Sequence, residues 1–290
     1  MANLSKNAQG ILWMILSMAG FAAEDALIKA SGQNLPIAQV LCLFGFGGML
    51  IFGASALISG QRLFVPEVIS RPMFIRAGFE VMGRLFYTLA IVLAPLTIVT
   101  VILQATPLVV VASAAILFHE NVGWRRWVAI GLGFVGVVIV MQPGSDRFTV
   151  FTLFAILGLF GFAGRDLASR AAPATLSTSQ LGIYGFLALI VAGVIYSIWE
   201  QAPFVWLDGS TFLYMMGAVT FGVIGYAALM RAMRTGEVSA VTPFRYSRLL
   251  FGVALGVIFF GEVLTANILV GSILILAAGL FIIWRGNASK

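Results

Sequence analysis

The chain has 290 residues, of which 61% are hydrophobic and only 10% charged, whereas an ordinary soluble chain is about a quarter charged. This composition excludes a soluble domain. A single cysteine, Cys42, excludes an internal disulfide and a thiolate metal cage, and a single histidine, His119, removes most metal and triad chemistry. The net charge of +6 is not gathered in a basic patch, so we expect no nucleic-acid partner, no metal and no cofactor.

Long apolar stretches predict membrane-spanning helices along the chain. Residues 30–61, 85–118 and 171–199 contain no charge, and each exceeds the about 20 helical residues that cross a bilayer core. We expect an all-α integral membrane protein, because helices satisfy their own backbone hydrogen bonds in lipid. Ten transmembrane helices are predicted, at residues 9–30, 36–58, 72–92, 97–118, 125–142, 149–170, 178–199, 211–231, 239–260 and 265–284.

The distribution of Lys and Arg predicts the orientation of these spans. With the N-terminus inside, only Lys29 and Arg147 fall on the outer side. The inner side then holds Lys6, Arg62, Arg71, Arg125, Arg126, Arg170, Arg231, Arg234, Arg285 and Lys290. We therefore expect a multi-pass protein of the inner membrane with both termini in the cytoplasm.

The first predicted span is repeated in the sixth. Residues 16–30 and 157–171, at an offset of 141 residues, are identical at six of fifteen positions. A second match, at an offset of 142, relates residues 117–120 to residues 259–262. Five spans per half is an odd number, so the second half has to be inserted upside down. The sequence thus predicts two inverted five-helix repeats, with domains at residues 1–145 and 146–290.

In both copies of this repeat, an acidic residue is followed four positions later by a basic one. Asp25 and Lys29 lie in the first copy, and Asp166 and Arg170 lie in the second. This order favours an acid–base pair along a helix. We interpret the four residues as symmetric gate elements, one pair near each face. The alternative is that they only cap or anchor their spans at the interface.

The third span carries three charged residues on one helical stripe. Arg76, Glu80 and Arg84 are four residues apart, and the last two lie too deep to reach the interface. A charge at mid-bilayer costs about 3 kcal/mol or more, so these two must face the bundle interior or water. Either Arg84 contacts solute in a cavity and is oriented by Glu80, or the two form an internal salt bridge that locks helices together.

The fifth span contains Gly131-Leu-Gly133-Phe-Val-Gly136, which matches the dinucleotide-binding fingerprint letter for letter. That fingerprint needs a strand before it and a helix after it, whereas this one lies inside an apolar span. We interpret these glycines as positions where transmembrane helices approach closely. The same role is expected for Gly45, Gly48, Gly271 and Gly279.

The ninth span carries Arg245, Tyr246 and Arg248 near mid-membrane. Arginine offers donors suited to carboxylate or phosphate oxygens, and tyrosine adds an aromatic face and a hydroxyl. We expect Arg245 and Tyr246 to contact solute. Arg248 either joins them or pairs with an acidic residue, Glu80 or Asp25.

Backbone and aromatic groups complete the predicted site. The Thr242-Pro243 step weakens the ninth span and frees backbone groups that a cavity can use. Aromatic cavity contacts are expected from Phe21, Tyr87 and Tyr226, which lie on spans that also carry polar residues. The predicted solute-binding set is therefore Arg84, Arg245, Tyr246, Arg248, Glu80, Phe21, Tyr87 and Tyr226.

Three local patterns accompany the repeat. They are Pro107 followed by Phe118-His119-Glu120-Asn121 and Trp124-Arg125-Arg126-Trp127, the glycines of the fifth span leading to Met141-Gln142-Pro143, and Val241-Thr242-Pro243-Phe244-Arg245-Tyr246. With ten spans in two fives, these patterns make the whole chain resemble EamA-type members of the drug/metabolite transporter superfamily. The resemblance implies export or uptake of small organic solutes through a central cavity, without an ATP-binding part. Similar members handle amino acids, S-adenosylmethionine or riboflavin, so the resemblance does not fix the substrate.

The sequence therefore predicts a secondary transporter or facilitator, not an enzyme, that moves a small polar organic metabolite by alternating access. Spans 1, 3, 4, 6, 8 and 9 are expected to line its cavity. The partners are a small-molecule solute and membrane lipid, and the protein is a monomer or a homodimer. A non-transporting receptor or assembly protein is the alternative, with the buried charges as ion pairs only. A third hypothesis is an intramembrane enzyme acting on a lipid or prenyl substrate. Such an enzyme would need a nucleophile with a base, or a set of metal ligands, and the single His, the single Cys and the lack of an acid-rich motif argue against it.

Overall fold

The computed structural model describes residues 5–117, 123–142, 149–170, 173, 175–235 and 241–287. This part of the chain is helical and contains no strand, which confirms the all-α prediction. Two 3-10 helices, η1 (Pro66–Ile69) and η2 (Thr242–Tyr246), precede α3 and α11. The α-helices are α1 (Lys6–Ser31), α2 (Ile37–Ile58), α3 (Arg71–Leu93), α4 (Leu96–Leu103), α5 (Thr106–Leu117), α6 (Trp124–Met141), α7 (Val150–Arg170), α8 (Thr178–Glu200), α9 (Gly209–Thr235), α11 (Ser247–Phe260) and α12 (Ala266–Asn287).

The described helices account for the predicted membrane spans. Nine segments in the described ranges are long and apolar enough to cross a membrane, and α4 and α5 together form one of them. α3 is a further helix of 23 residues, and it departs from the apolar pattern because it carries the charged stripe. Large apolar side chains such as those of Ile58, Trp199 and Phe259 are exposed on the outside of the bundle. Such a surface fits lipid rather than water as the surrounding solvent.

The fourth predicted span is present, at Leu96–Leu117, and its helix is interrupted after Leu103. α4 ends at Leu103 and α5 begins at Thr106. The cause is Pro107, which has no backbone N–H to donate to the carbonyl of Leu103. The Thr106 hydroxyl donates to that carbonyl instead, at 2.6 Å. In the ninth span, the predicted weakening around Pro243 is confirmed, because the chain there forms η2 before α11 begins.

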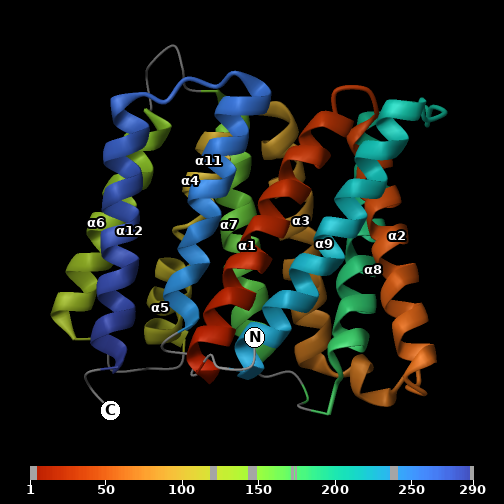
Figure 1. Cartoon of the computed structure of the whole chain (residues 1–290), viewed down its shortest axis with the longest axis horizontal. Coiled ribbons are helices and arrows are strands. Elements are labelled where there is room, and N and C mark those ends of the chain that lie inside the picture. Colours follow the sequence, from red (N-terminus) through yellow and green to blue (C-terminus); the bar gives the residue numbers. More distant parts are fainter. Residues whose placement is uncertain are drawn as a thin grey trace.

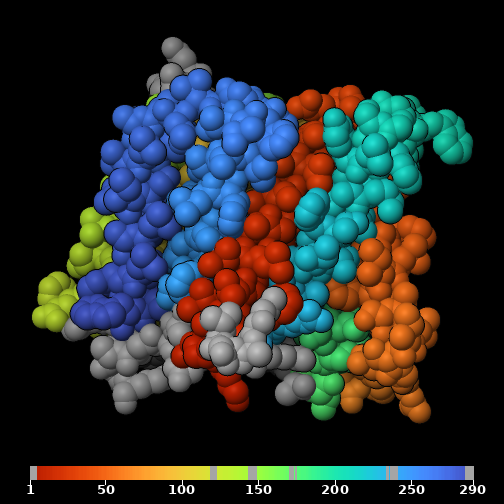
Figure 2. All heavy atoms as spheres, viewed as in Figure 1, coloured from red at the N-terminus to blue at the C-terminus, as the bar shows by residue number. Residues whose placement is uncertain are grey.

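The largest helix–helix contacts each join one helix before residue 142 to one after residue 149 (Figure 1). α1 packs along α9, α3 along α7, α2 along α8 and α6 along α12, and α4 packs against α11. On the face shown in Figure 2, α1 lies between α11 and α9. α1 begins and α12 ends at the same edge of the bundle (Figure 1). This arrangement is expected for an even number of membrane spans, because each span takes the chain to the opposite edge.

Two helix crossings are made at glycines in matching positions. A Cβ atom on Gly20 of α1 would lie 3.2 Å from the Cα atom of Gly225 of α9. A Cβ atom on Gly161 of α7 would overlap the backbone of Gly83 of α3. Gly161 follows Gly20 by 141 residues and Gly225 follows Gly83 by 142, which are the offsets of the sequence repeat. The α1–α9 and α3–α7 contacts therefore use equivalent positions of the two halves.

The predicted role of the other glycines is confirmed with one exception. Gly136 of α6 and Gly271 of α12 face each other, since a Cβ atom on Gly136 would lie 2.8 Å from the Gly271 carbonyl oxygen. Gly131 was expected to pack in the same way, but this is wrong. A Cβ atom at Gly131 would have no neighbour within 4 Å, because this residue lies on an exposed face of α6. The close approaches are made by Gly45, Gly48, Gly133, Gly136, Gly271 and Gly279.

Candidate functional site

Charged side chains from four helices gather in the interior of the bundle. We call this set the charge network. A buried charge is tolerated only when it is paired and hydrogen-bonded. The carboxylate side chains on α1 and α3 expose no more than 3% of their surface, and each lies within 3.4 Å of an arginine. The members are Glu24 and Asp25 on α1, Arg76, Glu80 and Arg84 on α3, Arg165 and Asp166 on α7, and Arg248 on α11.

Glu80 is the centre of the network. Its Oε1 atom accepts hydrogen bonds from Arg84 Nε and Arg165 Nη1, both at 3.3 Å, and its Oε2 atom accepts from Arg76 Nη2 at 3.4 Å. The predicted stripe on the third span is therefore confirmed as a set of contacts. Arg84 Nη1 also donates to Glu24 Oε1 of α1 at 3.3 Å. The carboxylate of Glu80 thus ties α3 to α7 directly and, through Arg84, to α1.

A second part of the network joins α1, α3 and α11. Arg248 Nη2 donates to Asp25 Oδ2 at 2.6 Å, and Tyr87 Oη donates to the same oxygen at 3.0 Å. Of the two predicted partners of Arg248, the structure therefore selects Asp25. The Arg248 guanidinium also lies 5.3 Å from the ring centre of Phe21 and 5.7 Å from that of Tyr87. Two of the three predicted aromatic residues thus lie beside it, whereas Tyr226 packs edge-on against Phe52, with ring centres 5.3 Å apart.

The α7 end of the network is less buried. Arg165 Nη2 lies 2.8 Å from Asp166 Oδ1, and the two side chains expose 22% and 30% of their surface. Ser169, one turn further along α7, accepts a hydrogen bond from Arg76 Nε at 3.0 Å. The side chain of Arg170, which was expected to pair with Asp166, lies outside the described part of the chain. Among the described side chains, Asp166 pairs with its neighbour Arg165, and the predicted pair with Arg170 stays a prediction.

The expected pair between Asp25 and Lys29 is not formed, and this prediction is wrong. Lys29 Nζ donates to the backbone carbonyls of Ile91 at 3.0 Å and Ala94 at 2.6 Å. Ile91 lies in the last turn of α3 and Ala94 is its C-cap residue. Carbonyls at this end have no partner within the helix, and the helix dipole there favours a cation. Tertiary partners on α3 and α11 therefore separate two residues that are neighbours on α1.

Glu262 lies at the same corner of the bundle. Its Oε1 and Oε2 atoms accept hydrogen bonds from the first backbone N–H groups of α4, those of Leu96 at 2.6 Å and Thr97 at 2.7 Å. Glu200 caps α2 in the same manner, with bonds from Ile37 and Ala38 at 2.8 and 2.9 Å. Both caps join the two halves of the chain. Glu120, the repeat counterpart of Glu262, lies outside the described residues, as does His119.

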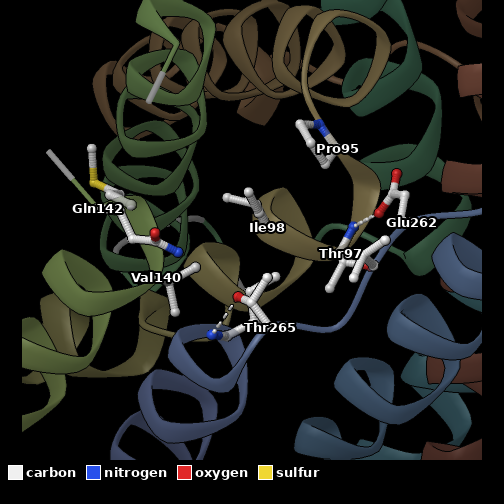
Figure 3. A pocket seen from close by; sticks show the side chains of 10 residues that line it. Pro95, Thr97, Ile98, Val140, Gln142, Glu262 and Thr265 are labelled. Atoms are coloured by element: carbon white, nitrogen blue, oxygen red, sulfur yellow. Dashed lines mark hydrogen bonds between the residues drawn. The ribbon is translucent and has the colours of Figure 1, made fainter. Parts of the chain in front are cut away.

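A cavity of about 290 Å³ opens beside Glu262 (Figure 3). Figure 3 shows Glu262 bound to Thr97 on one side of this cavity and Gln142 on the other. No member of the charge network contributes to its wall. The cavity is lined by Pro95, Thr97, Ile98, Val140, Met141, Gln142, Glu262, Val263, Thr265 and Ile268. It is therefore separate from the predicted solute site.

Arg245 and Tyr246 occupy η2, at the break in the ninth span. Tyr246 is buried, and its hydroxyl lies against Gly279 of α12 without a hydrogen-bond partner in the described part of the chain. The backbone carbonyl of Arg245 accepts a bond from Gln104 Nε2 at 3.5 Å, which joins the breaks of the fourth and ninth spans. The half-buried Arg245 guanidinium makes no ion pair with any described residue. It differs in this respect from the four arginines of the network.

Three members of the network were absent from the predicted solute-binding and gate residues. Arg76 was predicted only as part of the charged stripe on the third span. The other two members are Glu24 and Arg165. They occupy equivalent positions, 141 residues apart, immediately before Asp25 and Asp166. A signal was therefore present in the repeat, because both copies place an extra charge next to the matched acid. The opposite sign of the two charges hid the match. Within the described ranges, no group of three or more His, Cys, Asp or Glu side chains is placed to hold a metal ion.

Comparison with known proteins identifies relatives over the whole chain. A model of the EamA-like transporter family matches residues 8–142 and again residues 149–284. An S-adenosylmethionine uptake transporter of Rickettsia felis is 26% identical over 281 residues, which cover 95% of this chain and 92% of that protein. A pseudopaline exporter, CntI, of Pseudomonas aeruginosa is 25% identical over 277 residues, covering 93% and 94%.

Two further matches are less complete or more distant. A riboflavin transporter of Vibrio cholerae is 26% identical over 192 residues, which cover 65% of this chain and 63% of that protein. A protein of known crystal structure superimposes with a TM-score of 0.65 over 98% of this chain and 99% of its own, at 18% identity. That likeness concerns the fold alone.

Proposed function

Because the chain belongs to the EamA-like transporter family, we propose that it is a secondary transporter of a small polar organic metabolite, of the amino acid, S-adenosylmethionine or riboflavin class. It is a multi-pass membrane protein whose relatives are transporters. We place it in the inner membrane with both termini in the cytoplasm. The excess of basic residues on that side of the predicted spans supports this orientation.

The observation that carries the proposal is the charge network. Four arginines and four carboxylates lie inside a bundle that faces lipid, on helices from both halves of the chain. Ionisable groups at this depth are costly, and in membrane proteins they mark solute and ion pathways. In secondary transporters the solute site lies at the interface of the two repeats. The network occupies such an interface, since it joins α1 and α3 to α7 and α11.

Arg245 is our candidate for the first contact with an anionic group of the solute. Its guanidinium has no carboxylate partner in the described structure, so its donors are available to a carboxylate or phosphate oxygen. Gln104 and Arg245 meet where two spans are interrupted. Interrupted helices at mid-membrane are a recurrent feature of transporter solute sites, because they present backbone groups to a cavity.

We propose that residues 1–145 and 146–290 are inverted repeats that rock against each other. The pairing of helices supports this arrangement. Exchange of the two halves turns the α1–α9 contact into the α7–α3 contact, and both crossings use equivalent glycines. The gates then lie at opposite faces. One is formed by Lys29 at the α3–α4 corner, and the other by Asp166 with Arg165 on α7.

A receptor or assembly protein is the second candidate function. The observation that favours it is that each carboxylate of the network pairs with an arginine, which would also suit a rigid structural core. The two candidate functions predict different results when the flux of labelled solute across the membrane is measured. A receptor binds solute and is stabilised by it, but labelled solute does not cross the membrane.

The proposal is tested by uptake into proteoliposomes with a panel of labelled amino acids, S-adenosylmethionine, riboflavin and nucleotide-like anions. We expect flux of one class, reduced at least about tenfold in Arg245→Ala. Arg231→Ala is the matched control, because Arg231 is exposed and its guanidinium lies over the ring of Trp13, 5.0 Å from the ring centre, away from the charge network. Equal flux in all three proteins would remove Arg245 from the site. Thermal stabilisation by a solute without any flux would support the receptor.

A further inference from the structure

We propose that Asp25 and Arg248 form the subsite for the zwitterionic head group of an α-amino acid. The ammonium group of the solute would be received by Asp25 Oδ1 and its carboxylate by Arg248 Nε. The inference rests on the proposed transport function and deepens it, because it distinguishes amino-acid-like solutes from flavin-like ones. It derives from two polar atoms of this ion pair that have no hydrogen-bond partner among the described residues.

The first of these atoms is on Asp25. The side chain of Asp25 exposes only 2% of its surface, and its Oδ2 atom accepts bonds from both Arg248 and Tyr87. Its Oδ1 atom is buried and accepts no hydrogen bond from any residue in the described ranges. Buried carboxylate oxygens are almost always hydrogen-bonded, so an orphaned one calls for a donor that the described structure does not contain.

The second atom is on Arg248. Its Nη2 atom donates to Asp25 and Tyr87, while its Nε–H is buried and meets no acceptor in the described part of the chain. The rings of Phe21 and Tyr87 lie beside the guanidinium at 5.3 and 5.7 Å. A guanidinium held against aromatic rings keeps its plane, so its free donor keeps a fixed direction. The pair therefore carries a buried acceptor, Asp25 Oδ1, and a buried donor, Arg248 Nε, that no described residue uses.

The charge balance selects the class of solute. A simple cation would satisfy Asp25 Oδ1 and leave Arg248 Nε unpaired, and a simple anion would do the opposite. A zwitterionic head group supplies a cationic donor and an anionic acceptor at the same time, and at this subsite it adds no net charge to the buried network. In a low-dielectric interior an added net charge is strongly disfavoured. A water molecule could bridge the same two atoms, and the experiment has to separate that case.

The first step of the test uses the intact protein in proteoliposomes. Uptake of labelled S-adenosylmethionine and labelled riboflavin is measured, each in competition with unlabelled compounds. L-methionine carries both charged groups, its 2-hydroxy analogue lacks the ammonium, L-methioninol lacks the carboxylate, and methylthioadenosine lacks both. We expect L-methionine to compete at least about tenfold better than the three analogues, because each lost group leaves a buried atom unpaired.

The second step assigns the effect to the two residues. In Asp25→Asn, we expect L-methionine to lose its advantage over the 2-hydroxy analogue, while both still compete. The double variant Asp25→Asn/Arg248→Gln removes both charges together, so it leaves no uncompensated buried charge and tests the subsite if the single variant does not fold. Glu200→Gln is the matched control, because Glu200 is a partly buried carboxylate that caps α2. We expect this variant to keep the head-group preference of the intact protein.

The possible failures can be told apart. Transport of riboflavin with no competition from zwitterions would overturn this inference and leave the transporter proposal standing. An equal loss for every solute in Asp25→Asn, with the head-group preference unchanged, would also overturn it and make the pair structural, with a water in the gap. An intact protein that transports and binds no compound of the panel would overturn the proposed function, and this inference with it.

Discussion

Lys29 and Glu262 hold the two sides of one corner of the bundle, with Lys29 Nζ 3.9 Å from Glu262 Oε1. Lys29 binds the carbonyls that end α3, and Glu262 binds the N–H groups that begin α4. Each side chain thus meets the helix end whose dipole has the opposite sign. Because Lys29 is on α1 and Glu262 follows α11, the α3–α4 corner is fastened to both halves of the chain at once.

The substitution Glu262→Gln is expected to loosen this corner. Gln keeps one acceptor for the N–H groups of α4 but loses the charge, and a lost helix cap costs about 1 kcal/mol. We therefore expect a lower midpoint of unfolding in mixed micelles of detergent and dodecyl sulfate. Glu67→Gln is the control, because Glu67 is exposed on η1 and should leave the midpoint unchanged. An unchanged midpoint in Glu262→Gln would mean that the cap contributes nothing.

A double-mutant cycle of Lys29→Met with Glu262→Gln should show sub-additive effects. The direct ion pair is long, at 3.9 Å, so the coupling has to arise from the shared corner. Once the loss of one side chain has released the α3–α4 corner, loss of the other side chain lowers the free energy of unfolding by less. We expect the double variant to be more stable than the sum of the single effects predicts, by about 0.5 kcal/mol or more. Strict additivity of the free energies of unfolding would show that α3 and α4 are held independently.

Glu80→Gln should be much more harmful than Glu262→Gln. Glu80 accepts hydrogen bonds from three arginines, so its neutralisation leaves an excess of buried positive charge. Breaking a buried pair in this way costs about 3–5 kcal/mol. We expect little monodisperse protein on size-exclusion chromatography. The double variant Glu80→Gln/Arg165→Gln should recover part of the yield, because it restores the balance of charge. A single variant with wild-type yield would contradict the central role of Glu80.

The sequence allowed the local part of the network to be predicted, but not its long-range part. Arg76, Glu80 and Arg84 lie on one stripe because a helix has a fixed period, and that inference holds in the structure. The same rule failed for Asp25 and Lys29. The spacing was favourable, but Arg248 and the end of α3 offered each of them a better partner. Helical spacing shows which residues can come into contact, but it does not show which of these contacts form in the folded protein.

Hydropathy alone also did not predict the interruption of the fourth span or the role of Glu262 as a helix cap. The span is continuous in composition, and Pro107 alone marks the break at Gln104. A proline in a membrane helix can also be accommodated by a kink, so its effect depends on the neighbouring side chains. In the sequence, Glu262 stands out only as a position of the repeat. Its function as a cap on α4 depends on the packing of α4 against α11, which the sequence does not specify.

The glycine crossings lead to a prediction with an internal control. Gly161→Ala should destabilise the protein, because the new methyl group would overlap the backbone of Gly83, which cannot move without shifting α3. Gly131→Ala adds the same methyl group where nothing lies within 4 Å. That change should be neutral or stabilising by up to about 1 kcal/mol, because alanine favours the helix over glycine. The measurement is the unfolding midpoint of both variants in the same micelles.

Since Gly20 meets Gly225 in the equivalent crossing, Gly20→Ala should lower the midpoint as well, by less, because its 3.2 Å approach can relax. Equal midpoints for Gly161→Ala and Gly131→Ala would contradict the close α3–α7 approach on which the packing of Arg165 beside Glu80 depends.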